Sequence, residues 1–186
     1  MNKIIILALL LNVGLISCKS PEKKINKLEL AYKYYHVLNT SDYSEIKTWF
    51  ADSLITKEGA YAQSYSQSEY LEFLKWDAVF DPNYKIIAID KQEGTIKTKI
   101  SKIDKRIVFL HEAPFITNQI IRFQNDKIIA VETEYVDFNE KIWNRNKTNL
   151  LNWIDKNHPE LNGFIYDQTE SGGIKFLKAI ELYKNK

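Results

Sequence analysis

The sequence is short of the residues that mark many small catalytic or cross-linked proteins. It contains a single cysteine, Cys18, so a disulfide within the chain is excluded. Its three histidines, His36, His111 and His158, stand too far apart for a recognised metal-binding spacing, and we expect neither a metal ion nor another cofactor. Glycine-rich phosphate loops and nucleophile-elbow motifs are missing as well. Packing alone must therefore stabilise the fold, and no standard motif assigns a reaction.

An excess of charge of one sign is also missing. The 186 residues carry 26 lysine and arginine side chains against 24 aspartate and glutamate side chains, a formal net charge of +2. Proteins that bind nucleic acid owe much of their affinity to basic patches that neutralise phosphates. The balanced composition therefore predicts no nucleic-acid partner.

One long apolar run is present, at the N-terminus. Lys3 precedes residues 4–16, which are largely apolar but too few to span a bilayer comfortably, a pattern typical of a secretory signal. Residues 15–18, Leu-Ile-Ser-Cys, resemble the lipobox of bacterial lipoproteins. That resemblance implies that residues 1–17 are removed as a signal peptide and that Cys18 becomes the lipid-modified first residue.

A lipid on Cys18 would anchor the protein to a membrane of the bacterial cell envelope. Lys19 stands where an aspartate would retain a lipoprotein in the inner membrane, so the resemblance implies the outer membrane, facing either the periplasm or the medium. Residues 18–24 are then a short lipidated tether. The alternative is an ordinary signal peptide or N-terminal anchor with Cys18 as a free thiol, which would be a liability in an oxidising compartment.

Hydrophobic periodicity predicts helices first and strands second, which is an α+β domain. Once past the turn at residues 81–83, the period changes to two, and Ile96, Thr98 and Ile100 are expected to face the helices while the intervening lysines face water. The turns between strands are too short for crossovers, which indicates an antiparallel meander. The predicted helices are residues 25–39, 41–50 and 66–79, with a hairpin near Glu58 and Gly59 between the last two, and the predicted strands are residues 85–90, 95–102, 106–112, 116–124 and 127–138.

The remaining residues, 139–186, are predicted to be a helical extension packed on the same domain. A helix over residues 139–157 has a stripe of large apolar side chains, and a second helix covers residues 174–183, with the Ser-Gly-Gly segment 171–173 before it as a cap. The stripe consists of Trp143, Leu150, Trp153 and Ile154. We expect the extension to cover the outer face of the sheet, which would favour a monomer over a homodimer, or to close the mouth of the domain as a lid.

Four segments of residues 25–138 are informative when taken together: residues 34–39 with Asp42 and Tyr43, residues 49–52, residues 123–129 and residues 134–137. They resemble the nuclear transport factor 2-like superfamily, which includes ketosteroid isomerase, scytalone dehydratase and polyketide cyclases. The resemblance implies a cone-shaped domain in which three N-terminal helices pack on a curved antiparallel sheet. It specifies a pocket and not a reaction.

A cone of this kind predicts a pocket with apolar walls and a few polar groups, which suits a small apolar ligand. The same aromatic side chains could instead fill the cone as core. The residues expected at the pocket are Trp49, Tyr61, Trp76, Phe80, His111, Asn118 and Tyr135.

Three functions remain open at the level of sequence, and one of them, an assembly role through dimerisation of the exposed sheet face, is implied by the resemblance alone. Of the other two, the first is a noncatalytic, membrane-anchored binding module for a small apolar ligand or an envelope protein partner. The alternative is a small acid–base enzyme, an isomerase, dehydratase or hydrolase, that uses His111 or a desolvated Glu132. Since Glu132 shares a strand face with Glu134, a solvated edge is the competing interpretation. A cavity above about 300 Å³ with a buried ionisable group is required for the enzyme, whereas a fully packed cone would exclude it.

Overall fold

The computed structural model describes residues 25–186, so the predicted signal peptide, Cys18 and the tether lie outside the described residues. Its helices are α1 (Lys27–Thr40), α2 (Ile46–Trp49), α3 (Gln67–Ala78), α4 (Lys105–Leu110), α5 (Glu140–Asn157) and α6 (Glu170–Lys184), with 3-10 turns at Pro159–Leu161 and Phe164–Tyr166. Its strands are β1 (Phe50–Glu58), β2 (Tyr61–Ser66), β3 (Asn83–Gln92), β4 (Thr95–Ile103), β5 (Phe115–Gln124) and β6 (Lys127–Tyr135). The α+β class predicted from periodicity is confirmed.

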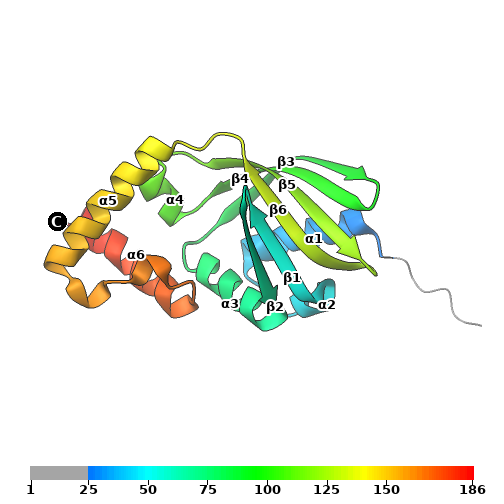
Figure 1. Cartoon of the computed structure of the whole chain (residues 1–186), viewed down its shortest axis with the longest axis horizontal. Helices are drawn as coiled ribbons and strands as arrows, with labels where there is room; N and C mark the ends of the chain where they lie inside the picture. The colour runs from blue at the N-terminus through cyan, green and yellow to red at the C-terminus, as the bar shows by residue number, and fades with distance from the viewer. Residues whose placement is uncertain (1–24) are drawn as a thin grey trace, which may run out of the picture.

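The six strands form one curved sheet in the order β2-β1-β6-β5-β4-β3 (Figure 1). Four of its five pairings are antiparallel, the orientation predicted for the meander, but β4 pairs directly with β5 because the strand expected between them, at residues 106–112, is absent, and β1 runs parallel to β6. A parallel neighbour requires a long crossover. Here the whole segment from β2 to β5 supplies it, which local periodicity alone does not reveal. Register shifts in three of the pairings increase the local bend of the strands.

Helices α1 and α3 cover the inner face of the sheet. The side chain of Asn26 caps α1 by accepting from the backbone of Leu28, and apolar residues at helical spacing are buried beneath it. In β4 the register is as predicted, because Ile96, Thr98 and Ile100 are buried while the lysines between them are exposed. This alternation gives the sheet one dry and one wet face.

Two predicted elements differ from the structure. The predicted strand 106–112 is wrong, because this segment forms helix α4. Asp104 caps the helix through a 2.6 Å hydrogen bond from the amide of Ile107, and Ile107 and Leu110 bury the same helical face. The predicted helix 41–50 is also reduced to the single turn α2, because Phe50 begins β1.

The C-terminal extension packs at one end of the cone, against α3 and α4, and not over the outer sheet face that we expected it to cover (Figure 1). A second hydrophobic core joins these helices, with Leu150 and Ile154 of α5 packed together with Phe176 of α6. Helix α6 begins earlier than predicted, since Thr169 caps it and the glycines at 172 and 173 lie within its first turn. The first described residues lie at the opposite end of the molecule.

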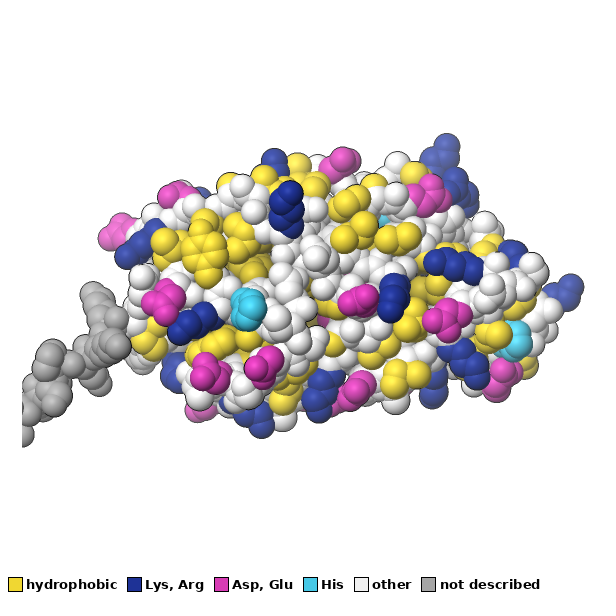
Figure 2. Space-filling model, turned by 180° about the vertical axis from the view of Figure 1, so that it is seen from behind, with side chains coloured by type: hydrophobic (Ala, Val, Ile, Leu, Met, Phe, Trp, Pro, Cys, Tyr) yellow, Lys and Arg dark blue, Asp and Glu magenta, His cyan; other side chains and the backbone are white. Residues whose placement is uncertain are grey.

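Charges of both signs are interspersed over the surface seen from behind (Figure 2), in line with the balanced composition. Within residues 25–186, no helix combines the length and the apolar character needed to span a bilayer.

Candidate functional site

A cavity of about 440 Å³ opens between α3 and the inner face of the sheet, at the end of the cone that carries the C-terminal helices. Eleven aromatic side chains line it, and Trp143 and Gln168 of the C-terminal extension form part of its wall, next to Phe138. The volume lies within the range of small-molecule sites. The aromatic lining consists of Tyr34, Tyr61, Tyr65, Tyr70, Phe73, Trp76, Tyr84, Phe115, Tyr135, Phe138 and Trp143, of which Tyr61 stands exposed at the rim.

The tyrosine hydroxyls of the cavity are neutral hydrogen-bonding groups. Tyr34 and Tyr70 share a hydrogen bond of 2.7 Å between their hydroxyls. Burial raises the pKa of both phenols, and it also raises the pKa of Tyr135 at the mouth. These groups therefore stay protonated near neutral pH and can donate or accept a hydrogen bond without adding charge.

The floor of the cavity holds a buried ion network. Asp77 of α3 accepts a 2.5 Å bond from Lys102 Nζ at Oδ1 and a 2.7 Å bond from the hydroxyl of Tyr84 at Oδ2. Arg106 Nη2 lies 3.4 Å from Oδ2 of Asp104, and Lys102 Nζ lies 3.7 Å from the same oxygen. Two cations and two carboxylates therefore neutralise one another at the base of a cavity whose walls combine aromatic side chains with several polar ones, such as Thr117, Gln119 and Thr133.

The charges in this network are mutually stabilised. Burial alone would raise the pKa of Asp77, but the positive charges of Lys102 and Arg106, with the hydrogen bonds from Lys102 and Tyr84, outweigh it and lower the pKa. Burial likewise opposes the charge on Arg106, yet Asp104 and Asp77 raise its pKa. Since both oxygens of Asp77 are occupied and its pKa is lowered, its carboxylate is a weak base.

Arg106 is held by aromatic faces. Its guanidinium carbon lies 4.7 Å from the ring centre of Trp76 and 5.2 Å from that of Phe80. Arg106 Nε and Trp76 Nε1 are buried without a hydrogen-bond partner among residues 25–186. The aromatic rings thus hold Arg106 in place, but two buried N–H groups at the floor have no hydrogen-bond acceptor in the part of the chain that the structure describes.

Three of the residues predicted for the pocket line the cavity, namely Tyr61, Trp76 and Tyr135. Phe80 is fully buried in the second core, where it supports Arg106 from behind. Trp49, in α2, is half-buried against the main core and away from the cavity lining. Asn118 points to the outer face of the sheet, because it alternates with the inward-facing Thr117.

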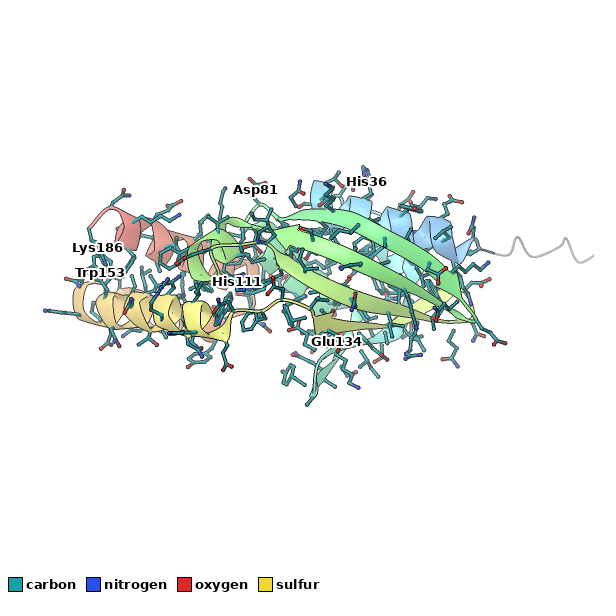
Figure 3. The ribbon with its side chains drawn as sticks, turned by 90° about the horizontal axis from the view of Figure 1, so that it is seen from above. His36, Asp81, His111, Glu134, Trp153 and Lys186 are labelled. Atoms are coloured by element: carbon teal, nitrogen blue, oxygen red, sulfur yellow. The ribbon has the colours of Figure 1, made fainter. Side chains whose placement is uncertain are left out.

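His111 follows helix α4 and is buried outside the cavity lining, where the sheet meets the C-terminal helices (Figure 3). Its Nε2 accepts a 2.8 Å hydrogen bond from the backbone amide of Asn139, so Nδ1 carries the proton that is shared with the carbonyl of Ala113, also at 2.8 Å. The ring stacks on Phe138 at 5.3 Å. Both ring nitrogens are occupied in joining α4 to the start of α5, which is a structural role.

Glu132 lies on the outer face of the sheet, where it forms hydrogen bonds of 2.5 and 3.1 Å with Arg122. Those hydrogen bonds lower its pKa, which is the reverse of the raised pKa that a buried general acid would need.

Around Glu132, an open trough of about 650 Å³ crosses the outer face, lined by exposed side chains of both signs such as Lys97, Lys99 and Glu134. An enclosed site for an apolar molecule is better provided by the inner cavity.

Sequence reasoning missed the ion network. Asp77 lies on a helix, Lys102 on a strand and Arg106 on the helix that was predicted as a strand, so only the folded chain brings them together. One signal was present: Lys102 continues the inward-facing series of Ile96, Thr98 and Ile100. A lysine on a buried strand face implies a buried partner.

Among residues 25–186, no group of His, Cys, Asp or Glu side chains is arranged to hold a metal ion.

No protein-family model and no curated protein sequence matches this chain. Solved structures do resemble it, and their fold is nuclear transport factor 2-like. A nuclear transport factor 2-like protein of unknown function from Cytophaga hutchinsonii is 9% identical with a TM-score of 0.49, covering 61% of this chain and 93% of that chain.

Two other similar structures belong to proteins described by an activity. A ketosteroid isomerase-like protein from Kribbella flavida is 11% identical, with a TM-score of 0.49, and covers 61% of this chain and 80% of that chain. SalBIII, an epoxide hydrolase/cyclase-like enzyme with a role in pyran ring formation in the polyether salinomycin, is 10% identical. Its TM-score is 0.50, and it covers 57% of this chain and 88% of that chain. Similarity at this level of identity shows the fold alone.

Proposed function

We propose that this protein is a noncatalytic binding module that holds a small, mainly apolar ligand in the aromatic cavity. The observation that carries the proposal is a cavity of about 440 Å³ whose ionisable floor groups are paired with one another. Aromatic walls supply contact area for an apolar body, and the tyrosine hydroxyls supply orienting hydrogen bonds. Neither requires a reaction.

The acid–base enzyme is the competing function. The cavity is large enough for it and contains the buried Asp77, so the enzyme is not excluded by a packed cone. However, His111 and Glu132 lie outside the cavity lining, and Asp77 is held in its ionised form by Lys102 and Tyr84. A carboxylate with a lowered pKa and both oxygens engaged is poorly suited to take a proton. These contacts favour binding over catalysis.

The proposal includes a lipid anchor on Cys18 and an outer-membrane location, which rest on the lipobox-like residues 15–18. In the described domain, the first residues leave at the end opposite to the C-terminal helices (Figure 1). A tether there would direct the cavity end away from the lipid surface. Mass spectrometry of the membrane-bound protein should find diacylglycerol on Cys18, and the C18S form should leave the membrane fraction; an unmodified Cys18 in the membrane fraction would contradict the anchor.

Ligand binding can be tested with naphthylmethanol as an uncharged aromatic probe, because Trp76 and Trp143 line the cavity and should report on it by fluorescence. Thr117→Phe would fill the cavity from β5, whereas Asn118→Phe adds the same ring to the outer face. We expect the first variant to lose most of the binding and the second to retain it. Absence of saturable binding by the wild-type protein, or equal loss in both variants, would overturn the proposal, and turnover of a bound compound would favour the enzyme.

A further inference from the structure

The ion network at the cavity floor has more hydrogen-bond donors than acceptors. A lysine ammonium and an arginine guanidinium together offer eight N–H groups. Against these, Asp77 gives one oxygen to Lys102 and the other to Tyr84, while Asp104 gives one oxygen to the amide of Ile107 and the other to Arg106. The carboxylate oxygens are therefore engaged, and donors remain.

The cations also lie closer to the open space than the carboxylates do. The side chains of Lys102 and Arg106 are each 15% exposed, compared with 5% for Asp77 and none for Asp104. Lys102 and Arg106 line the cavity, whereas Asp104 lies behind them as the cap of α4. Although the four charges sum to zero, a group that enters the cavity meets the positive members first.

We propose that this floor recognises a carboxylate, so that the ligand is an apolar organic acid whose acid group binds at Lys102 and Arg106. The inference rests on the proposed ligand-binding role of the cavity and narrows the class of ligand. A carboxylate has only hydrogen-bond acceptors, and the surplus N–H donors of the floor lack acceptors among the described residues. The aromatic walls above the floor then surround the apolar body of the acid.

The two cations are positioned before any ligand arrives. Arg106 is held between the faces of Trp76 and Phe80, and Lys102 Nζ lies 4.7 Å from the ring centre of Tyr84. Preorganised donors bind an acid at a smaller cost in side-chain entropy than flexible surface lysines do. The unpaired Nε of Arg106 shows in addition that its guanidinium is not saturated by protein acceptors in residues 25–186.

A cationic ligand fits this floor less well. It would need free acceptors, and the carboxylate oxygens of Asp77 and Asp104 are already engaged. Glu58, at the mouth, is the remaining acid of the cavity lining and accepts a 3.3 Å bond from Tyr135. An amine could pair with Glu58 at the rim but would place its charge beside Lys102 and Arg106 if it reached the floor.

The test compares three probes of similar shape on the full-length protein: naphthoate, naphthylmethanol and naphthylmethylamine. Hydrogen bonds from Lys102 and Arg106 to its carboxylate, in a site shielded from water, should make naphthoate bind at least about tenfold more tightly than naphthylmethanol. Equal affinities, or a preference for the amine, would overturn the inference and leave the proposed function intact. Failure of all three probes would instead remove the proposed function together with the inference.

Amino-acid substitutions test whether the preference for naphthoate arises at the cavity floor. Replacing Lys102 alone would leave Asp77 buried without its strongest partner, so the decisive variant is Asp77→Asn with Lys102→Met, which removes both charges together. It should keep its affinity for naphthylmethanol and lose about tenfold in affinity for naphthoate. Lys99→Met, on the outer face of the same strand, is the matched control and should change neither. An unchanged naphthoate preference in the double variant would overturn the assignment of the acid group to this floor.

Discussion

Asp77 is the residue on which the cavity floor depends, because one buried carboxylate joins α3 to Tyr84 of β3 and Lys102 of β4. It is 3% exposed. A buried ion pair adds little stability compared with an apolar pair of the same shape, but loss of one partner leaves the other charge buried and uncompensated. The network is therefore sensitive to single changes and tolerant of paired ones.

We predict that Asp77→Asn lowers the free energy of unfolding by about 3 kcal/mol, because Lys102 loses its nearest buried carboxylate and Arg106 keeps only Asp104. The same change should make the free energy of unfolding depend less on pH in the acid range. The lowered pKa of Asp77 means that its contribution is present above the unfolded value of about 3.9 and is lost as the pH falls through the lower folded value.

Urea unfolding at a series of pH values below neutrality measures both effects. Glu29→Gln, in an exposed pair with Lys33, is the control and should leave stability nearly unchanged. A wild-type slope in the acid range that persists in Asp77→Asn would show that other carboxylates are responsible.

His111 allows a second prediction at this scale, which separates a structural histidine from a catalytic one. His111→Phe keeps an aromatic ring against Phe138 but leaves the amide of Asn139 and the carbonyl of Ala113 without partners. We expect a loss of about 1–3 kcal/mol in unfolding free energy. Naphthylmethanol binding by the folded fraction should be unchanged, and the exposed His36→Phe should be neutral. A stable His111→Phe protein that no longer binds the probe would contradict this role.

Among the elements, β4 and α4 show what local sequence does and does not determine. The alternation of Ile96, Thr98 and Ile100 with lysines predicted the register of β4, since a one-residue slip would bury the charges. In the segment that forms α4 and the residue after it, Ile107, Phe109 and His111 also alternate, a pattern that favours a strand. The Asp104 cap and the three-residue spacing of Ile107 and Leu110 fit a helix equally well, and packing against α5 and α6 decides between them.

The candidate site was less predictable than the fold, for a related reason. Aromatic side chains at helix and strand positions that face inward could be assigned to the cavity, as for Trp76 and Tyr135. The ionic floor could not, since Arg106 reaches it only because α4 is a helix, and Asp77 meets Lys102 of β4 only once the chain has folded. Residues that pair across different helices and strands have no characteristic spacing in the sequence that would reveal the pairing.

Helix α6 gives a prediction at the scale of one element. Gly172 lies in its first turn, where a Cβ atom would overlap the backbone oxygen of Asp167, and Gly173 packs directly on Trp76. Alanine normally favours a helix over glycine by about 1 kcal/mol. At residue 172 we expect the opposite, a lower melting temperature for Gly172→Ala, with Lys175→Ala on the exposed face as the neutral control. A raised melting temperature for Gly172→Ala would mean that the loop before α6 relaxes freely.

On the scale of the whole molecule, the extension is built into the cavity as well as into the core. Trp143 and Gln168 of the extension line the cavity, while Phe80 and Trp76 of the cone are packed in the second core with α5 and α6. Ring contacts of 5.6–5.7 Å join Trp143 to Phe138 and Phe115 across the boundary. Removal of the extension should therefore affect the site and the fold together.

Truncation after Phe138 tests this coupling. It would expose Trp76, Phe80 and Leu110, which are buried against residues of the extension, and aromatic side chains bury about 150–250 Å² each at about 25 cal/mol per Å². We expect the shortened protein to aggregate or to unfold at a lower temperature, and any folded fraction to lose naphthylmethanol binding. A deletion of residues 1–24 alone is the control, because it keeps every described residue of both cores. If the protein that ends at Phe138 melted cooperatively at the wild-type temperature and still bound the probe, the extension would be a separate unit whose surface serves a partner, and the cavity would belong to the cone alone.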